Sequence, residues 1–493
     1  MAYEVVIGLE VHAQLLTRSK MFCPCSAAYV NAPPNTHVCP ICLGMPGVLP
    51  VINQQAVEYT IMTGLALHCT IPPSSKFDRK NYPYPDLMKG YQISQYDLPL
   101  CVNGWLDIDV DGQTKRIGIT RVHLEEDVAK LLHRSVGGIT YSLMDVNRSG
   151  VPLMEIVGEP DLRSPEEARQ YLIKLRRILQ YLGVSTGNME EGSFRCDANI
   201  SLRPVGSTTL SAKVEVKNMN SFRAVHDALA YEVERQTKVL ESGGRVVQET
   251  RGWVEEQGAT ISQRSKEFAH DYRYFPEPDL PPLEVSRAWV ESLRSQLPEL
   301  PDARRERFIA EYGLSHYDAD QLTSSKAMAD FFERTVVAIA GSEDGHVAQA
   351  EQHAKAASNW CQGDFNRLLN LHGLEAHETK LTPQHLAELL KLIEAGTINL
   401  NSAKAVFQLM FDTGKPASAI VAEQGLTQIS AADELTSIVD RVLGQNPQPV
   451  ADFRSGKQQA LGFLLGQVMR ETRGRANPGA VQELLRRRLV ETA

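Results

Sequence analysis

The chain has 493 residues, of which 43% are hydrophobic and 23% are charged, and its formal net charge is −9. This length predicts several domains, since a domain usually has about 100 to 200 residues. The balance of apolar and charged residues excludes a disordered or fibrous protein. The N-terminus lacks the features of a secretory signal and no segment is apolar enough to span a membrane, which predicts a cytoplasmic protein.

The first predicted strand, 4–14, carries a carboxylate and an imidazole on one face. Successive side chains of a strand point to opposite faces, so residues two apart lie on the same side. Glu10 and His12 therefore share one face, while Leu9 and Val11 point to the other. An acid and a base thus become neighbours on a polar surface.

Four of the eight cysteines lie close together in the chain. They form two pairs, Cys23 with Cys25 and Cys39 with Cys42, separated by thirteen residues. Four thiolates that converge across a short loop suit a tetrahedral Zn²⁺ ion, and they leave no open position for catalysis. The cluster therefore predicts a structural zinc, with four reduced thiols as the alternative.

Two loops, 76–86 and 271–279, mix aromatic residues with charged ones. Lys80 lies in the first loop, and Lys89 follows it closely. Aromatic rings can stack on a base and cations can bind phosphate, so both loops are candidates for nucleotide contact. A solvated turn explains the first loop equally well, and proline-rich core packing explains the second about as well.

The predicted strand 117–125 also collects charge on one side. Arg121, His123 and Glu125 share a face, and Glu126 points the other way if the strand continues that far. Two later strands alternate in the same way and carry Arg195, Asp197 and Arg203 in 194–203, and Lys213, Glu215 and Lys217 in 213–217.

Amphipathic helices are predicted between these strands, at 164–183 and 221–243. Ser164 and Glu167 predict a capping box at the start of the first helix, where Pro165 suits the first helical position. Strands with inserted helices indicate an α+β fold with a mainly antiparallel sheet.

Charged faces on four strands favour a shared site over four solvated surfaces. Carboxylates with one histidine suit Mg²⁺, which works with nucleotide phosphates, and arginine or lysine would bind the phosphate oxygens. The chain has none of the motifs of P-loop, Rossmann, zincin or α/β-hydrolase enzymes, so ATP chemistry requires a different fold.

Six prolines between residues 276 and 301 predict the end of the strand-rich part of the chain. We predict a sheet domain over 1–294, with the zinc site inserted near 23–42, then an all-α helical domain over 295–410 and a helical tail domain over 411–493. The last boundary lies inside continuous helical periodicity and is set only to within some tens of residues.

The last 40 residues are basic although the whole chain is acidic. Between residues 454 and 493, eight Lys or Arg stand against three Glu, an excess of five positive charges. Such a segment is typical of contact with nucleic-acid phosphates, and a solvated helix face is the alternative. The arginines concerned are Arg470, Arg473, Arg475, Arg486, Arg487 and Arg488.

Long motifs of the chain closely resemble the B subunits of bacterial tRNA-dependent amidotransferases (GatCAB). The resemblance covers essentially the whole chain, and motifs of this length are specific. They are GLEVHAQL (8–15), KFDRKNYPYPD (76–86), YQISQYDLP (91–99), HLEED (123–127), MEIVGEPD (154–161), EEGSFRCDANISLRP (190–204), EVKNMNSF (215–222) and DYRYFPEPD (271–279).

The resemblance implies a reaction and its partners. An N-terminal cradle domain would use ATP and Mg²⁺ to phosphorylate the side-chain carboxylate of Glu-tRNA(Gln), Asp-tRNA(Asn) or both, and ammonia would displace the phosphate. The ammonia would come through a channel from the A subunit, which hydrolyses glutamine, and the C subunit would hold the other two together. The helical and tail domains would bind the misacylated tRNA, with no role for a membrane.

The resemblance also implies roles for single residues. By their places in the motifs, Glu10, His12 and Glu125 correspond to Mg²⁺ ligands, with Glu155, Asp197 and Glu215 near the same catalytic site. Lys80, Lys89 and Glu126 correspond to residues that line the ammonia channel. The four cysteines correspond to the zinc-containing branch of the family, and the arginines of the tail to tRNA-binding residues.

A second hypothesis from a different class is a non-catalytic scaffold that binds tRNA while another chain handles ATP. The acidic residues and the histidine favour the enzyme subunit, since a scaffold needs no convergent acidic site. The sequence leaves open whether Glu-tRNA(Gln), Asp-tRNA(Asn) or both are the substrates.

Overall fold

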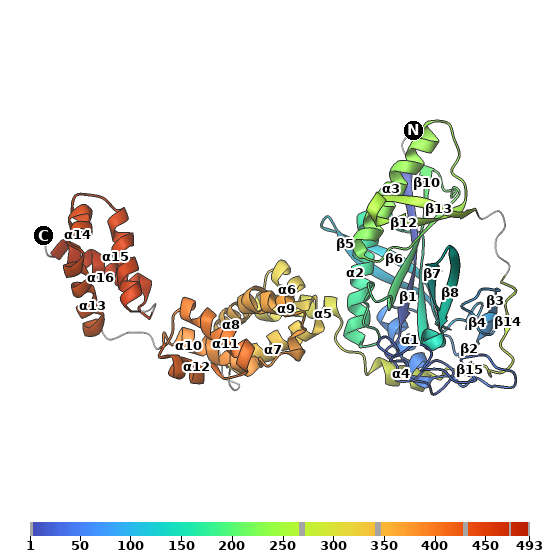
Figure 1. Ribbon diagram of the computed structural model, residues 1–493, viewed down its shortest axis with the longest axis horizontal. Helices are drawn as coiled ribbons and strands as arrows, with labels where there is room; N and C mark the ends of the chain where they lie inside the picture. Colours follow the sequence, from blue (N-terminus) through green and yellow to red (C-terminus); the bar gives the residue numbers. More distant parts are fainter. Residues whose placement is uncertain (1–2, 266–271, 341–346, 427–431, 473–474, 492–493) are drawn as a thin grey trace. The chain divides into compact units, whose positions relative to one another are not determined.

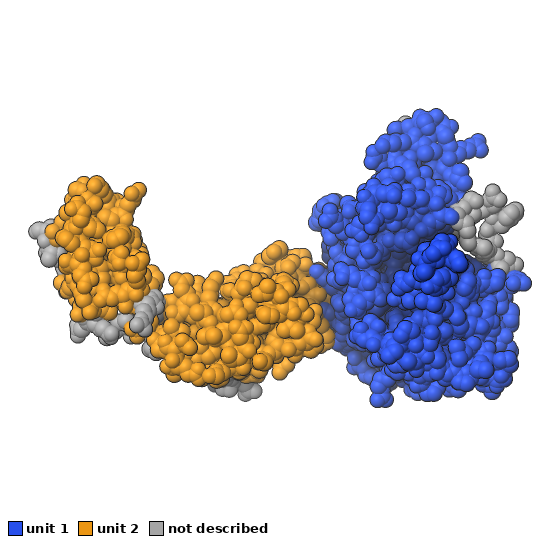
Figure 2. All heavy atoms as spheres, in the orientation of Figure 1, with its two compact units in different colours: residues 1–300 blue, residues 301–493 orange. Residues whose placement is uncertain are grey.

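The computed structural model describes all residues except 1–2, 266–271, 341–346, 427–431, 473–474 and 492–493. Residues 1–300 and 301–493 form two units, which Figure 2 colours separately. The first combines a mainly antiparallel sheet with helices and the second is helical, so the predicted fold class is confirmed. The first unit ends at Leu300, against a predicted domain end at 294.

The largest sheet of the first unit has eight strands in the order β13-β12-β11-β10-β1-β9-β6-β5 (Figure 1). All of its neighbouring strands are antiparallel except β11 and β12. The strands are β1 (Tyr3–Gln14), β5 (Cys101–Val110), β6 (Gln113–Glu126), β9 (Pro152–Gly158), β10 (Phe194–Pro204), β11 (Val214–Lys217), β12 (Glu249–Val254) and β13 (Ala259–Ser265).

One face of this sheet is apolar and packs on helices. Val11, Val122 and Ile156 are fully buried on it, each from a different strand. The helices that contact the sheet are α1 (Gln54–Ala66), α2 (Pro165–Leu182) and α3 (Phe222–Glu241), and Figure 1 shows α2 and α3 lying along it. Burial of this face fixes the register, because a slip by one residue would expose every apolar side chain.

Helix α2 starts at the predicted residue but with a different cap. Ser164 Oγ accepts a hydrogen bond from the backbone N–H of Glu167 at 3.1 Å, as an N-cap does. The Glu167 carboxylate accepts from the backbone N–H of Arg163 at 2.7 Å instead of that of Ser164, so the predicted capping box is only half formed. Lys115 Nζ lies 2.7 Å from the same carboxylate, which ties the helix start to β6.

Smaller sheets surround the large one. The sheet β14-β3-β4 packs against β6 through β4, and β7 and β8 form a separate hairpin. The elements are β2 (Ser74–Ser75), β3 (Asp78–Asn81), β4 (Tyr91–Ser94), β7 (Lys130–Val136), β8 (Ile139–Asp145), η1 (Val146–Arg148), η2 (Glu255–Gln257), β14 (Phe275–Pro276), β15 (Leu283–Glu284) and α4 (Arg287–Arg294).

The second unit has two separate hydrophobic cores, one spanning Phe308 to Val421 and one spanning Leu435 to Leu489. The predicted boundary after residue 410 falls inside α11, because helical periodicity on both sides gives no signal of the change of core. The first core contains α5 (Pro301–Tyr312), α6 (His316–Thr323), α7 (Lys326–Ala340), α8 (Val347–Trp360), the π-helix η3 (Cys361–Phe365), α9 (Asn366–His372), η4 (Ala376–Glu378), α10 (Pro383–Glu394), α11 (Leu400–Thr413) and α12 (Ala417–Gln424).

The second core of this unit is built by α13 (Ala432–Gln445), α14 (Pro447–Arg454), α15 (Gln459–Glu471) and α16 (Pro478–Glu491). Leu461, Leu464 and Val468 form its buried stripe on α15. Within the described part of the chain, no helix has both the length and the apolar character needed to cross a membrane.

Candidate functional site

Three side chains from neighbouring strands converge on the polar face of the large sheet. His12 on β1, Glu125 on β6 and Glu155 on β9 each offer a ligand atom, and these atoms lie within 4.8 Å of one another. The Nε2 atom of His12 is 3.6 Å from Glu125 Oε1 and 3.5 Å from Glu155 Oε2. Both carboxylates are buried and the His12 side chain is 20% exposed, so two acids and an imidazole share a site with little access to water.

The register of the sheet creates this convergence. Directly paired residues of antiparallel strands point to the same side, with their Cβ atoms about 5 Å apart. His12 pairs with Arg195 on β10 and with Glu155 on β9, and Glu155 pairs in turn with His123 on β6. One row across four strands therefore reads Arg195, His12, Glu155, His123, and Glu125 lies two residues further along β6.

His12 and the two carboxylates stabilise each other in their charged forms. Burial opposes a charged imidazole, yet the Glu155 and Glu125 carboxylates raise the pKa of His12 to about 8. Burial likewise opposes a charged Glu155, and the adjacent His123 and His12 hold its pKa well below the usual value. The His12 proton thus occupies the place that a cation could take.

The residues of this cluster fit a hard divalent ion. Mg²⁺ prefers oxygen ligands and is commonly held by one or two carboxylates with water and phosphate oxygens filling the remaining positions. His123 Nε2 lies 3.2 Å from Glu155 Oε2, the same oxygen that faces His12, so both imidazoles help to orient this carboxylate. His123 Nδ1 is buried and has no hydrogen-bond partner in the described part of the structure.

The other predicted acidic residues lie along the same face but outside this trio. Glu10 Oε1 accepts a hydrogen bond from Asn199 Nδ2 at 2.9 Å, and Glu10 pairs with Asp197 across β1 and β10. Lys217 forms ion pairs with Asp197 and with Glu215, which together raise its pKa to about 12 against the effect of burial. Glu155 thus lies next to His12 and Glu125, whereas Glu10, which the resemblance assigns to the metal, lies two residues from His12 on β1.

Arg195 is held beside the cluster by a buried carboxylate that sequence patterns did not reveal. Asp127 Oδ2 accepts from Arg195 Nη2 at 3.0 Å and from Gln14 Nε2 at 2.7 Å, and Asp127 Oδ1 lies 3.7 Å from Arg148 Nε. Asp127 is 2% exposed, and the neighbouring Arg195 and Arg148 hold its pKa below the usual value although burial acts the other way. Asp127 thus fixes where the Arg195 guanidinium points.

Asp127→Asn should lower the free energy of unfolding by about 3 kcal/mol at pH 7, near the lower end for a broken buried ion pair because its arginine partners are partly exposed. The Asp127 carboxylate has a lowered pKa, so its contribution is present above the unfolded value of about 3.9 and is lost as the pH falls through the folded value. The difference between wild type and variant should therefore shrink below about pH 4.

Denaturant unfolding at several pH values, followed by tryptophan fluorescence, measures this difference. Asp107→Asn is the matched control, because Asp107 forms an exposed pair with Arg116 and its loss should cost under about 1 kcal/mol. An equal cost for both variants would contradict the structural role of Asp127.

Lys80 lies near the cluster on the small sheet that packs against β6. Its Nζ atom lies 5.9 Å from the centre of the Tyr82 ring and 5.3 Å from that of Tyr272. Burial opposes its charge, but the nearby Glu125 and Glu155 carboxylates keep its pKa above the usual value. Two carboxylates of the trio thus stabilise the charged form of Lys80.

Lys89 and Glu126 form an ion pair on the opposite side of β6 from Glu125. They border a pocket of about 230 Å³ whose wall includes Cys42, Gly44 and Met45. Glu126 also accepts from the backbone N–H of Ile93 at 3.0 Å, so the pair is held rigidly.

A polar route connects this pocket with Lys80. Gln92 Nε2 donates to the Glu126 carbonyl oxygen at 2.8 Å, and Tyr82 Oη donates to Gln92 Oε1 at 3.2 Å. Tyr82 in turn contacts Lys80 through its ring. The predicted channel residues are thus linked by two side chains that sequence reasoning did not identify, since only the pairing of β3 with β4 brings them together.

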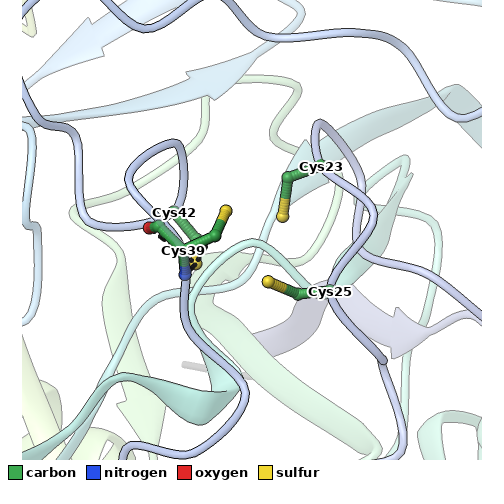
Figure 3. Close-up of side chains that lie close together, drawn as sticks. All are labelled: Cys23, Cys25, Cys39 and Cys42. Atoms are coloured by element: carbon green, nitrogen blue, oxygen red, sulfur yellow. Dashed lines mark hydrogen bonds between the residues drawn. The ribbon is translucent and has the colours of Figure 1, made fainter.

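The four cysteines converge as predicted. Their sulfur atoms lie within 4.8 Å of one another, and Figure 3 shows Cys23 and Cys25 facing Cys39 and Cys42. A tetrahedron with Zn–S bonds of about 2.3 Å has sulfur atoms about 3.8 Å apart, and the Cys39 and Cys42 sulfur atoms are 3.8 Å apart. The neighbouring Cys23 thiol lowers the pKa of Cys42, and Cys42 and burial raise the pKa of Cys23.

The arginines of the tail take different positions. Arg470, Arg486 and Arg487 are exposed on α15 and α16, whereas Arg473 lies outside the described residues. Arg475 Nε donates to the Thr472 carbonyl oxygen at 3.2 Å, and Arg488 Nε lies 3.3 Å from Asp440 Oδ1 on α13. The three exposed arginines are accessible to a polyanion, whereas Arg488 already pairs with Asp440.

Comparisons with known proteins agree along the whole chain. Residues 5–291 match the family model described as the GatB/GatE catalytic domain, and residues 345–489 match that described as the GatB domain. The chain is 61% identical over 492 residues to the B subunit of the aspartyl/glutamyl-tRNA(Asn/Gln) amidotransferase of Dehalococcoides mccartyi (strain CBDB1), with 99% of each chain covered.

Proteins of the same name from other organisms are similarly close. The one from Thermomicrobium roseum is 58% identical, with 100% of this chain and 99% of the relative covered. The one from Thermoanaerobacter pseudethanolicus is 56% identical, with 99% of this chain and 100% of the relative covered. The matched catalytic-domain region contains the trio, the cysteine cluster and the pocket.

Proposed function

Because the chain belongs to the GatB/GatE family of tRNA-dependent amidotransferase subunits, we propose that its first unit converts the side-chain carboxylate of Glu-tRNA(Gln), Asp-tRNA(Asn) or both into an amide at the expense of ATP. The observation that carries this proposal is the convergence of His12, Glu125 and Glu155 on one polar sheet face. A non-catalytic scaffold is not favoured, because the region containing the trio matches a catalytic domain.

The reaction has two steps, phosphorylation of the carboxylate and displacement of the phosphate by ammonia. A carboxylate is a poor electrophile, so one of its oxygens first attacks the γ-phosphorus of ATP, the bond to the bridging oxygen breaks, and ADP leaves with that electron pair. The lone pair of ammonia then attacks the acyl carbon, the bond to the phosphate oxygen breaks, and a proton leaves the nitrogen. The products are the amide, ADP and inorganic phosphate.

The chain supplies positions and charges for this chemistry. A Mg²⁺ ion held by His12, Glu125 and Glu155 would neutralise phosphate charge when bound. Asp127 holds the Arg195 guanidinium on the strand position that pairs with His12, where its other N–H groups could bind phosphate oxygens. Glu10, Asp197 and Glu215 border the site and orient Asn199 and Lys217 along the same face.

The second step requires ammonia inside the first unit. We infer that it enters at the pocket beside Lys89 and Glu126 and passes Gln92 and Tyr82 to reach Lys80. An A subunit that hydrolyses glutamine would deliver it at the pocket, and a C subunit would hold the complex together. The name of the relatives, which designates one subunit of an enzyme, supports a multi-subunit complex.

We further infer that the second unit binds the tRNA with Arg470, Arg486 and Arg487, which are exposed. Arg475 and Arg488 are further candidates in the same tail, and Arg473, which lies outside the described residues, is a candidate on the sequence alone. Contacts of this kind neutralise phosphates and make binding weaken steeply with salt. A tRNA substrate implies a cytoplasmic location for the complex.

His12→Ala should reduce ATP-dependent amide formation by at least about 100-fold in the assembled complex when free ammonium replaces glutamine, because a metal ligand is lost. Conversion of Glu-tRNA(Gln) to Gln-tRNA(Gln) and release of ADP are measured together. His226→Ala is the matched control, since His226 lies on α3, which packs on the apolar face of the sheet, and pairs with Asp227. Equal activity of the His12 variant and the control would overturn the proposed function.

A further inference from the structure

A β-bulge in β6 turns Arg121 toward the trio. Ile117 and Ile119 are buried on the apolar side, so strict alternation would place Arg121 there as well. The pairing of β6 with β9 shifts at this point, with Ile119 opposite Gly158 and Arg121 opposite Val157. One extra residue is inserted, and Arg121 comes to share the polar face with His123 and Glu125. Bulges often re-aim a side chain beside an active site.

Arg121 has no partner for its positive charge among the residues that the structure describes. Its Nε atom is buried without a hydrogen-bond acceptor, and no described carboxylate forms an ion pair with it. A buried donor is normally satisfied, so an orphaned one indicates an acceptor that a ligand supplies. Arg121 differs in this from the other cations of the face.

Those other cations are already engaged. Arg195 is bound to Asp127, Lys217 to Asp197 and Glu215, and Arg203 to Glu4. Arg121 instead lies next to Val157, which pairs with Glu10, and it acts electrostatically on Tyr274. It therefore borders the trio on the side toward Glu10, within the aromatic edge of the small sheet.

We propose that Arg121 is a further catalytic residue that binds the oxygens of the phosphoryl group transferred from ATP. This inference rests on the proposed function. A guanidinium stays protonated and presents paired N–H donors that match phosphate oxygens, so it can neutralise their charge without giving up a proton. It would serve while the carboxylate oxygen attacks phosphorus, and again when inorganic phosphate leaves the acyl carbon.

The test uses the assembled three-subunit complex with Arg121→Ala, Arg121→Lys and the control Arg116→Ala. Arg116 lies on the same strand but pairs with Asp107 at an exposed position. With ammonium as nitrogen donor, Arg121→Ala should lower kcat for amide formation by about 100- to 1,000-fold. Arg121→Lys should recover part of this loss, and Arg116→Ala should match wild type.

A second measurement separates a catalytic role from a structural one. Removing a cation beside two carboxylates should leave Mn²⁺ binding without nucleotide as tight as in wild type or tighter, while binding of a non-hydrolysable ATP analogue weakens. A merely structural role would weaken Mn²⁺ binding and lower the unfolding midpoint. Wild-type kcat in Arg121→Ala, or a loss of kcat that parallels a loss of Mn²⁺ affinity, would overturn the inference.

Failure of this inference can be told apart from failure of the proposed function. An inactive Glu125→Gln variant beside a fully active Arg121→Ala variant would overturn the role of Arg121 alone. Full activity of both variants would overturn the proposed function as well.

Discussion

Glu125→Gln should lower kcat for ammonium-driven amide formation by about 1,000-fold in the assembled complex. The change removes one negative charge from the trio and keeps the size and shape of the side chain. Ser94 Oγ lies 3.3 Å from Glu125 Oε2, and the glutamine oxygen can still accept this hydrogen bond, so the fold should survive. The loss therefore measures the contribution of the negative charge of Glu125. This charge holds the metal ion that the transferred phosphoryl group requires.

Glu126→Gln is the sharpest comparison, because adjacent residues of one strand face opposite sides of the sheet. Glu126 pairs with Lys89 at the pocket, away from the trio. This variant should lose most glutamine-driven activity, because a neutral amide cannot form the ion pair with Lys89 that borders the ammonia route in the wild type. It should keep ammonium-driven activity near the wild-type value.

Initial rates with glutamine and with ammonium, each at saturating ATP and tRNA, give both results in one series. A Glu125 variant that works with ammonium would remove carboxylate activation from this site. A Glu126 variant that loses both activities equally would remove its separate role in ammonia delivery.

Period-two alternation was sufficient to predict which side chains share the polar face. β1 and β10 have nearly the predicted bounds, and Glu10 and His12 lie opposite the buried Leu9 and Val11. Alternation carries no information on which strands are neighbours. Only the position of β9 between β1 and β6 brings Glu155 to His12 and leaves Glu10 two residues away.

Other parts of the site depend on tertiary structure that leaves no local pattern. Asp127 follows the end of β6 and reaches Arg195 on β10 and Gln14 on β1, three segments far apart in sequence. The bulge before Arg121, in contrast, does interrupt the alternation, because the buried apolar residues stand at 117 and 119 but then at 122 and 124, whereas the sequence analysis treated 117–125 as one regular strand. Irregularities of this kind are expected at functional sites, where local rules give way to the needs of a ligand.

The cysteine spacing, in contrast, predicted its cluster correctly because the ligand geometry of zinc is local. Two short loops are enough to bring four sulfur atoms together, whatever the rest of the fold does. The internal boundary of the second unit could not be predicted from the sequence in this way, because amphipathic helices have the same pattern in both of its cores. The start of this unit at Pro301 was marked by prolines, whereas the change of core near residue 430 had no such mark.

Cys42→Ser should release the zinc that the cysteine spacing predicts for this cluster and unfold the segment around it. Regular structure is sparse between β1 and α1, where the only described pairing outside named strands is Ser19 with Ser26. Such a segment depends on its metal, whose apparent binding free energy is on the order of 10 kcal/mol in small zinc sites. Metal analysis should show loss of zinc, and limited proteolysis should show new cleavage between residues 20 and 50.

Cys42→Ser should reduce glutamine-driven activity before it reduces ammonium-driven activity. The loop that carries Cys39 and Cys42 forms a wall of the pocket beside Lys89. A Cβ atom at Gly44 would collide with the Lys89 side chain, so this loop and Lys89 pack closely together. Loss of the loop should therefore reduce glutamine-driven activity first and leave ammonium-driven activity largely intact, as in Glu126→Gln. Cys69→Ala is the control, since Cys69 is buried apart from the cluster and should keep the zinc. Equal loss of both activities in Cys42→Ser would instead tie the zinc loop to the trio itself.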